Sequence, residues 1–261
     1  MDYGLRGKRA LVTGGSHGIG LAVAKALVVE SCHVAICSRS SERLAAAELM
    51  LRVPGVEIKA LQVDVLDIAQ IAAATDAIDE VWQGGVDILV NNVGGGGRWG
   101  TPSIEETPIS VWESVYRKNA GAAVAFTRWA ISGMRRRRWG RVVTIASIYG
   151  REGGGRPWYT MAKAAEIGMM KALATTPYLV HDGITFNTVA PGSIMIADTG
   201  WDEHRESDPT AFSDQLDCAF PLGRLGTPEE VAAAVLFLCS TQASLVNGAC
   251  MVVDGGESAS F

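Results

Sequence analysis

The chain has 261 residues, of which 48% are hydrophobic and 20% charged, and its formal net charge at pH 7 is −5. This composition excludes an intrinsically disordered chain, which is poor in apolar residues and rich in net charge. An acidic chain is not drawn by bulk electrostatics to nucleic acid or to an anionic membrane, and the purest apolar run, 231–239, is far shorter than the roughly 18 residues that suggest a membrane span.

The cysteines and the N-terminal segment indicate a cellular compartment. The five cysteines are scattered and include no C-x-x-C pair: Cys32, Cys37, Cys218, Cys239 and Cys250. We therefore expect neither a disulfide framework nor a zinc site, and no other metal site. Residues 1–8 have no apolar core of the kind found in a signal peptide. Together these features favour the reducing cytoplasm.

Short apolar runs rich in Val, Ile and Leu alternate with longer helical patterns along the whole chain. The runs mostly lack polar alternation, which suits strands that are covered on both faces. The expected strands are 9–13, 33–38, 56–63, 87–91, 141–146, 184–190 and 250–253, and the expected helices are 19–30, 41–51, 68–82, 108–134, 159–178 and 228–240. This order predicts an α/β fold, with a single doubly wound Rossmann-type domain over 1–261 and a mostly parallel seven-stranded sheet.

Two segments interrupt this alternation. Segment 93–108 contains the consecutive glycines Gly94 to Gly97, and segment 191–224 is long and acidic. Each follows an expected strand, so both should lie at the carboxyl edge of the sheet, where ligands bind in open α/β folds. Long loops in compact domains are often lids. We therefore expect a substrate lid at about 193–222.

The first expected strand leads directly into T-G-G-S-H-G-I-G at 13–20, and a helix follows. Glycines permit the tight turn and the close approach of a pyrophosphate, which the free N–H groups and positive end of the helix would hold. A strand before and a helix after are the context that a dinucleotide-binding turn requires. The residues expected to bind the cofactor here are Gly14, Ser16, His17, Gly18, Ile19 and Gly20; His17 is equally compatible with a surface histidine that has no role.

The spacing G-x-x-x-G-x-G from Gly14 to Gly20 resembles that of the short-chain dehydrogenase/reductase family rather than the common G-x-G-x-x-G. Later segments resemble the same family: N-N-V-G at 91–94, Y-x-x-x-K at 159–163, N-T-V-A-P-G at 187–192, P-L-G-R-L-G-T-P-E-E-V at 221–231 and V-D-G-G at 253–256. The resemblance covers nearly the whole chain. It is closest to the branch of 3-oxoacyl-carrier-protein reductases, sugar dehydrogenases and polyketide ketoreductases.

The end of the second strand indicates which dinucleotide is bound. NAD-binding folds place a carboxylate here to accept a hydrogen bond from the ribose 2′-hydroxyl, whereas this chain has Ser38, Arg39 and Ser40. The guanidinium of Arg39 suits a 2′-phosphate, and the two serines can add hydroxyl donors. We predict NADP(H) as the preferred cofactor, with NAD(H) possible. The alternative for Arg39 is a solvated charge at the start of a helix.

The resemblance implies further cofactor contacts after later strands. Asp64 and Val65 are implied to bind the adenine, and Asn91, Val93 and Gly94 to lie near the adenosine ribose. The nicotinamide end is implied to involve Pro191, Gly192 and Ile194. A threonine that the family often carries a few residues later is replaced, since Ile196 occupies the nearest position.

Tyr159 and Lys163 are four residues apart in an expected helix, so their side chains share one face. A free tyrosine has a pKa of about 10, and a neighbouring cation lowers it towards useful acid–base chemistry. The resemblance implies a catalytic set of Asn119, Ser147, Tyr159 and Lys163. Tyr159 would exchange a proton with the substrate oxygen and Ser147 would position that oxygen. Lys163 would lower the pKa of Tyr159 and hold the nicotinamide ribose, and Asn119 would anchor a relay water.

Substrate contacts are expected from the loops 95–99, 149–158 and 194–220. Aromatic side chains suit a sugar ring or a flat ketone, and the candidates are Trp99, Tyr149, Trp158 and Trp201; local packing of each tryptophan is an equal alternative. We predict an NADP(H)-dependent ketoreductase or alcohol dehydrogenase acting on a small-molecule ketone or alcohol. The alternatives are an NAD(P)-dependent sugar or cyclitol dehydrogenase working oxidatively, and a dinucleotide-binding regulator without catalysis.

Two expectations concern partners. The run R-R-R-R at 135–138 lies at a helix end, where cations suit the helix dipole, so we interpret it as a solvated face and expect neither nucleic acid nor membrane as a partner. The resemblance implies a homotetramer or homodimer, in which the helices 108–134 and 159–178 form a dimer contact and the C-terminal strand and its tail meet a partner subunit.

Overall fold

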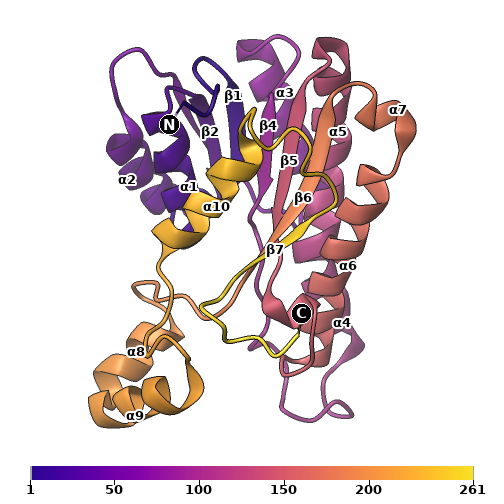
Figure 1. Cartoon of the computed structure of the whole chain (residues 1–261). Helices are drawn as coiled ribbons and strands as arrows, with labels where there is room; N and C mark the ends of the chain where they lie inside the picture. The colour runs from indigo at the N-terminus through magenta and orange to yellow at the C-terminus, as the bar shows by residue number, and fades with distance from the viewer. Residues whose placement is uncertain (1, 261) are drawn as a thin grey trace.

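The computed structural model describes residues 2–260. Within this range seven strands form one sheet in the order β3-β2-β1-β4-β5-β6-β7, and every neighbouring pair is parallel (Figure 1). The strands are β1 (Arg9–Thr13), β2 (His33–Ser38), β3 (Ile58–Gln62), β4 (Ile88–Asn91), β5 (Gly140–Ile145), β6 (Ile184–Pro191) and β7 (Cys250–Val253). The predicted doubly wound parallel sheet is confirmed, with strand ends within two residues of those expected.

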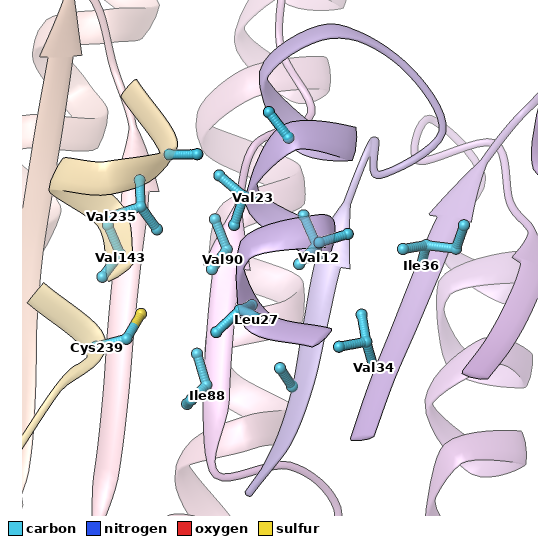
Figure 2. Close-up of a cluster of buried hydrophobic side chains, with 14 of the residues drawn as sticks. Val12, Val23, Leu27, Val34, Ile36, Ile88, Val90, Val143, Val235 and Cys239 are labelled. Atoms are coloured by element: carbon cyan, nitrogen blue, oxygen red, sulfur yellow. The ribbon is translucent and has the colours of Figure 1, made fainter. Parts of the chain in front are cut away.

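Helices cover both faces of the sheet (Figure 1). One face carries α1 (Gly18–Val29), α2 (Ser41–Leu51) and α10 (Pro228–Cys239), and the other carries α3 (Ile68–Val81), α5 (Ala122–Arg137) and α6 (Pro157–Ala174). Successive strand residues point to opposite faces. Val12, Val90 and Val143 therefore pack beneath α1 and α10 (Figure 2), whereas their neighbours Leu11, Leu89 and Val142 pack beneath α5.

The long helix expected at 108–134 is divided into three parts. The chain runs from α4 (Ile109–Tyr116) through a π-helical turn, η1 (Arg117–Gly121), into α5. The helix expected at 159–178 instead starts at Pro157 and stops at Ala174, and a separate short helix, α7 (Pro177–Val180), follows. Proline cannot continue a helix from within because it lacks the N–H group, and Pro177 accounts for this second break.

The segment expected as a loop and lid contains two helices, α8 (Gly200–Ser207) and α9 (Pro209–Ala219). They extend away from the sheet (Figure 1) around a small apolar cluster of Phe212, Phe220 and Leu225, with Trp201 packed against it. Asp208 caps α9 by accepting from the N–H of Ala211. The segment's action as a lid stays a prediction. Across residues 2–260, no helix has the length and apolar character needed to cross a membrane.

Candidate active site

The carboxyl ends of the strands open into two cavities. The larger, of about 680 Å³, is lined by Ser147, Tyr159 and Lys163 among others. The smaller, of about 290 Å³, is lined by Ser38 and Arg39 among others. Asn92 and Gly94 line both. The two cavities therefore adjoin along one edge of the sheet, and an elongated ligand could occupy both.

The turn between β1 and α1 is rich in glycine, so side chains do not cover its backbone. Gly14 and Gly18 have φ of +65° and +53°, a conformation that favours glycine. A Cβ at Gly20 would lie 2.3 Å from the carbonyl oxygen of Gly14, so only glycine fits there. The Asn92 amide donates to the carbonyls of Thr13 and Gly14 at 2.9 and 3.2 Å. This turn suits a pyrophosphate at the N-terminus of α1.

The smaller cavity gathers cations. Arg39, Arg43 and Lys118 all line it, together with the carboxylate of Asp64. Burial and the positive charge of Arg39 lower the pKa of Lys118. Cations crowded in this way repel one another, so a dianionic phosphate would be held strongly between them. The residues present therefore fit the 2′-phosphate of NADP(H).

Sequence analysis missed two of these cations. Arg43 stands four residues after Arg39 in the first turn of α2, and this spacing could have indicated it. Lys118 comes from η1, and no local pattern links it to β2. Ser38 lines the cavity, while the hydroxyl of Ser40 caps α2 by accepting from the N–H of Arg43 at 3.2 Å.

Three elements bring the expected reacting groups to the larger cavity. Ser147 follows β5 and begins the 3₁₀ turn η2 (Ile148–Gly150), where its Oγ accepts from the N–H of Tyr149 at 3.2 Å. Tyr159 stands in the first turn of α6. Lys163 lies one turn later, with its Nζ 5.8 Å from the centre of the Tyr159 ring. A hydroxyl donor, a phenol and an ammonium thus share one cavity.

Lys163 is held on two sides. Its Nζ donates to the carbonyl oxygen of Ile145 and to the carboxylate of Glu166, both at 2.9 Å. Burial opposes the charge of Lys163, but the Glu166 carboxylate and the nearby Tyr159 together outweigh this effect and raise the pKa of Lys163. The ammonium is therefore a fixed cation, and two of its three N–H groups have acceptors in the part of the chain that the structure describes, which leaves the third for a ligand. Sequence analysis did not identify Glu166.

The Asn119 amide forms hydrogen bonds with the backbone of the glycine-rich segment. Its Nδ2 donates to the carbonyls of Val115 and Gly95 at 2.7 and 2.8 Å, and its Oδ1 accepts from the N–H of Gly95 at 3.1 Å. A Cβ at Gly94 would lie 2.8 Å from both Asn119 Oδ1 and Lys163 Nζ. The structure thus gives Asn119 backbone partners in the loop, and its implied role as a water anchor stays a prediction.

Comparisons with known proteins agree with this geometry. Residues 14–258 match the family model described as enoyl-(acyl carrier protein) reductase. The chain is 36% identical to the 3-oxoacyl-[acyl-carrier-protein] reductase FabG of Aquifex aeolicus, over 98% of this chain and 99% of the relative. It is 35% identical to the acetoacetyl-CoA reductase of Rhizobium meliloti, over 95% of this chain and 97% of that one.

The chain belongs to the short-chain dehydrogenase/reductase family. Among solved structures, it is similar to L-sorbose reductase of Gluconobacter frateurii, crystallised with NADPH and L-sorbose, with a TM-score of 0.90 and 32% identity over 100% of both chains. The resemblance drawn from the glycine-rich turn and the Y-x-x-x-K motif is confirmed.

Most of the residues expected to bind the cofactor line one of the two cavities. Gly14, Ser16, Asp64, Val65 and Val93 line the smaller one, and His17, Gly18, Ile19, Pro191, Gly192 and Ile194 line the larger one. His17 Nε2 lies 2.9 Å from the carbonyl oxygen of Ala197, so it ties the turn to the segment after β6. Gly20 and Ser40 line neither cavity.

Asn91 and Trp158 differ from expectation. Asn91 is buried and donates to the hydroxyls of Thr127 and Thr144, so it braces the sheet, and Asn92 occupies the cavity edge instead. Trp158 was expected among the substrate residues, but its side chain is fully buried and packs edge-to-face on Trp112 at 5.5 Å. Its position directly before Tyr159 turns it into the core because neighbouring helix residues point in different directions.

The other aromatic candidates have side chains at the larger cavity, and their contact with a substrate stays a prediction. Trp99, Tyr149 and Trp201 line the larger cavity. Trp99 also lies beneath the Lys118 ammonium, with 4.8 Å between Nζ and the ring centre. Among the residues the structure describes, no group of three or more His, Cys, Asp or Glu side chains could hold a metal ion.

Proposed function

We propose that this short-chain dehydrogenase/reductase is an NADP(H)-dependent oxidoreductase that transfers hydride between nicotinamide and a ketone or secondary alcohol of a small metabolite. The observation that carries the proposal is the meeting of Ser147, Tyr159 and Lys163 in a cavity that adjoins the cation-lined one. Relatives named as 3-oxoacyl-carrier-protein and acetoacetyl-CoA reductases support ketone reduction, and the NADPH complex of L-sorbose reductase supports the cofactor.

Tyr159, Ser147 and Lys163 each have a separate role in the proposed reaction. In reduction the phenol of Tyr159 donates a proton to the substrate carbonyl oxygen, and in oxidation it removes one from the alcohol. The Ser147 hydroxyl donates a hydrogen bond to the same oxygen and fixes its position. Lys163 favours the phenolate through its charge, and its remaining proton suits a ribose hydroxyl. NADP(H), when bound, supplies or accepts the hydride.

The decisive experiment compares the protein with its Tyr159→Phe variant. Oxidation of NADPH would be followed by nicotinamide absorbance with a 3-oxoacyl thioester, acetoacetyl-CoA and ketoses as substrates, and with a 2-enoyl thioester to test enoyl reduction. We expect Tyr159→Phe to abolish turnover while leaving NADPH affinity unchanged. Tyr178→Phe, on the exposed face of α7, is the matched control and should keep full activity.

Three other outcomes would contradict all or part of the proposed function. Turnover that survives in Tyr159→Phe would remove the acid–base role from Tyr159. Tight NADPH binding without turnover on any carbonyl substrate would support the non-catalytic regulator instead. A higher kcat/KM for ketoses than for any thioester would support the sugar or cyclitol dehydrogenase, the second candidate, which the similarity to L-sorbose reductase favours.

A further inference from the structure

We infer that Glu166 is a positioning residue, which holds Lys163 in place and sets the pH at which Tyr159 exchanges its proton. The inference deepens the proposed function, since it rests on Tyr159 being the acid–base group. The Glu166 carboxylate lines neither cavity, so it acts only through Lys163.

The geometry of the pair is specific. Glu166 follows Lys163 by three residues on α6, so both side chains lie on one face of the helix. Its Oε2 is 2.9 Å from Lys163 Nζ, and the two side chains are only 1% and 3% exposed. In the described part of the chain, Lys163 is the one cation within ion-pair distance of Glu166. A carboxylate this deep is costly unless it is paired, so the pair forms one unit.

The pair changes the electrostatics at the phenol. A lone ammonium beside Tyr159 would stabilise the phenolate and lower the pKa of the phenol. A carboxylate bonded to that ammonium cancels much of its field, because the pair has no net charge. Burial raises the pKa of the Glu166 carboxyl, but the Lys163 ammonium opposes this effect and favours the charged carboxylate. Glu166 therefore limits how acidic Lys163 can make Tyr159.

Other charged groups around α6 are few. Lys118 of η1 interacts electrostatically with Lys163, and Tyr149 of η2 with Tyr159. The remaining titratable groups on the elements packed against α6 are Arg117 of η1, Glu113 and Tyr116 of α4, Tyr178 of α7, and Arg141 of β5, which binds carbonyls at the opposite end of its strand. Glu166 is thus the carboxylate best placed to act on Lys163.

The pH profile of alcohol oxidation separates this role from a purely structural one. The kcat/KM for oxidation rises as Tyr159 loses its proton, so its midpoint reports the pKa of the phenol. In Glu166→Gln the lysine charge is no longer cancelled, and we expect the midpoint to fall by about one pH unit after each profile is scaled to its own plateau. Glu166→Asp keeps the charge but draws the carboxylate away from Lys163 by one methylene, so its midpoint should fall by a smaller but measurable amount.

Glu113→Gln is the matched control. It removes one negative charge from the exposed surface of α4, which packs on α6, and should leave the midpoint unchanged. A merely structural Glu166 would lower the plateau without moving the midpoint. A folded Glu166→Gln variant with the wild-type midpoint, or a higher one, would overturn the inference. If Glu166→Gln does not fold, Glu166→Asp decides, and an unmoved midpoint there overturns it equally.

A second measurement keeps this test separate from the proposed function. Alkaline titration of tyrosinate absorbance needs no turnover, and the difference between each protein and its Tyr159→Phe counterpart isolates the phenol at 159. If the wild-type protein turns over no substrate, the proposed function fails. The inference about Glu166 would still stand or fall on whether Glu166→Gln lowers the titration midpoint of Tyr159.

Discussion

Arg39 follows β2 and lines the smaller cavity with Arg43 and Lys118. A guanidinium bound to a phosphate makes charge-assisted hydrogen bonds, which contribute about 1.5–3 kcal/mol. In Arg39→Asp this attraction becomes repulsion of the 2′-phosphate, while a carboxylate can accept from the 2′-hydroxyl of NAD(H). We expect the ratio of kcat/KM for NADPH over NADH to fall by about 100-fold or more.

The control for this prediction is Arg52→Asp, the same charge change at the far end of α2, outside both cavities. It should leave the ratio unchanged. A ratio that is also unchanged in Arg39→Asp would mean that Arg43 and Lys118 alone select the phosphate.

Gly20 and Gly168 provide a second test at the level of single residues. A Cβ at Gly20 would meet the Gly14 carbonyl at 2.3 Å, whereas a Cβ at Gly168 would meet nothing within 4 Å. Gly20→Ala should therefore displace the phosphate-binding turn and raise the Kd for NADPH, measured by calorimetry. Gly168→Ala lies inside α6 and should raise the stability by up to about 1 kcal/mol. Equal NADPH affinity in the two variants would contradict this account of the turn.

Local spacing decided which site residues could be predicted. Tyr159 and Lys163 are one helical turn apart, and Arg39 sits where a strand ends, so patterns of a few residues were sufficient. Glu166 is a polar residue on a helix, a position that is usually solvated, and its burial depends on packing against the sheet. Lys118 lines the same cavity as Arg39 only because of the tertiary fold, and no local pattern links the two residues.

The π turn η1 determines how the glycine-rich segment meets the cavity. Its extra residue presents Asn119 to Gly95, where the amide makes its hydrogen bonds to the loop backbone. Asn119→Ala would leave the half-buried N–H and C=O of Gly95 without the Asn119 amide, at a cost of about 1–3 kcal/mol. We expect both a loss of stability in urea unfolding and a fall in kcat, because the loop lies against the Tyr159 ring at Gly97.

Asn187 is a matched control for Asn119. It is also fully buried and also binds loop backbone, at Val246 and Ala249, but it lines neither cavity. Asn187→Ala should lower stability by a similar amount and leave kcat unchanged at temperatures where the variant is folded. An unaffected kcat in Asn119→Ala would show that the hydrogen bonds between Asn119 and Gly95 contribute to stability alone.

The start of α10 contributes a pH-dependent part of the stability. Glu230 accepts from Arg224, and also from the N–H of Thr227 in a capping box, and these bonds lower its pKa from 4.5 to about 2. A depressed carboxyl pKa stabilises the fold above the unfolded value of 4.5, and this stabilisation is lost as the pH falls towards 2. The Tm difference between the protein and Glu230→Gln should therefore be constant above pH 5 and shrink between about pH 4.5 and 2.

Glu229→Gln controls for the helix dipole, because it removes a carboxylate from the same first turn of α10. Among residues 2–260 Glu229 forms no ion pair, whereas Glu230 pairs with Arg224. Its Tm difference from the wild type should be smaller than that of Glu230→Gln at neutral pH. A Glu230→Gln difference that stays constant down to pH 2 would exclude the capping pair as its source.

Buried strands and helices with an apolar periodicity were predictable from the sequence, whereas exposed helices were not. The apolar runs of β1, β2 and β7 predicted the limits of these strands to the residue. Helix α8 has no buried residue, so it lacks the apolar periodicity that identifies a helix. The Asp208-Pro209 pair, a cap followed by proline in the first turn, was the available signal for α9. The π turn left no signal except an asparagine within a helical pattern.

The cavities and the ion-pair network that stabilises the fold lie at opposite edges of the sheet. The cavities lie at the carboxyl edge, and the amino edge holds an ion-pair network around Asp87. Asp87 is 7% exposed in its side chain and accepts from the N–H of Arg9 and from Nε of Arg137, at 2.9 and 2.6 Å. A strand of five residues rises about 3.3 Å per residue, so roughly 15 Å of sheet separates the two edges.

Asp87→Ala should therefore destabilise the protein without weakening cofactor binding. Burial lowers the pKa of Arg137, and Asp87 counteracts this effect, so the variant leaves two partly buried guanidinium groups without their carboxylate. The expected loss is about 3 kcal/mol in the free energy of unfolding, measured in urea, with an unchanged Kd for NADPH. Asp182→Ala removes pairs to the more exposed Arg135 and Arg138 and should cost less than about 1 kcal/mol. A Kd that rises in Asp87→Ala but not in Asp182→Ala would mean that the β-sheet transmits strain between its edges, and that stability and binding are not separable in this fold.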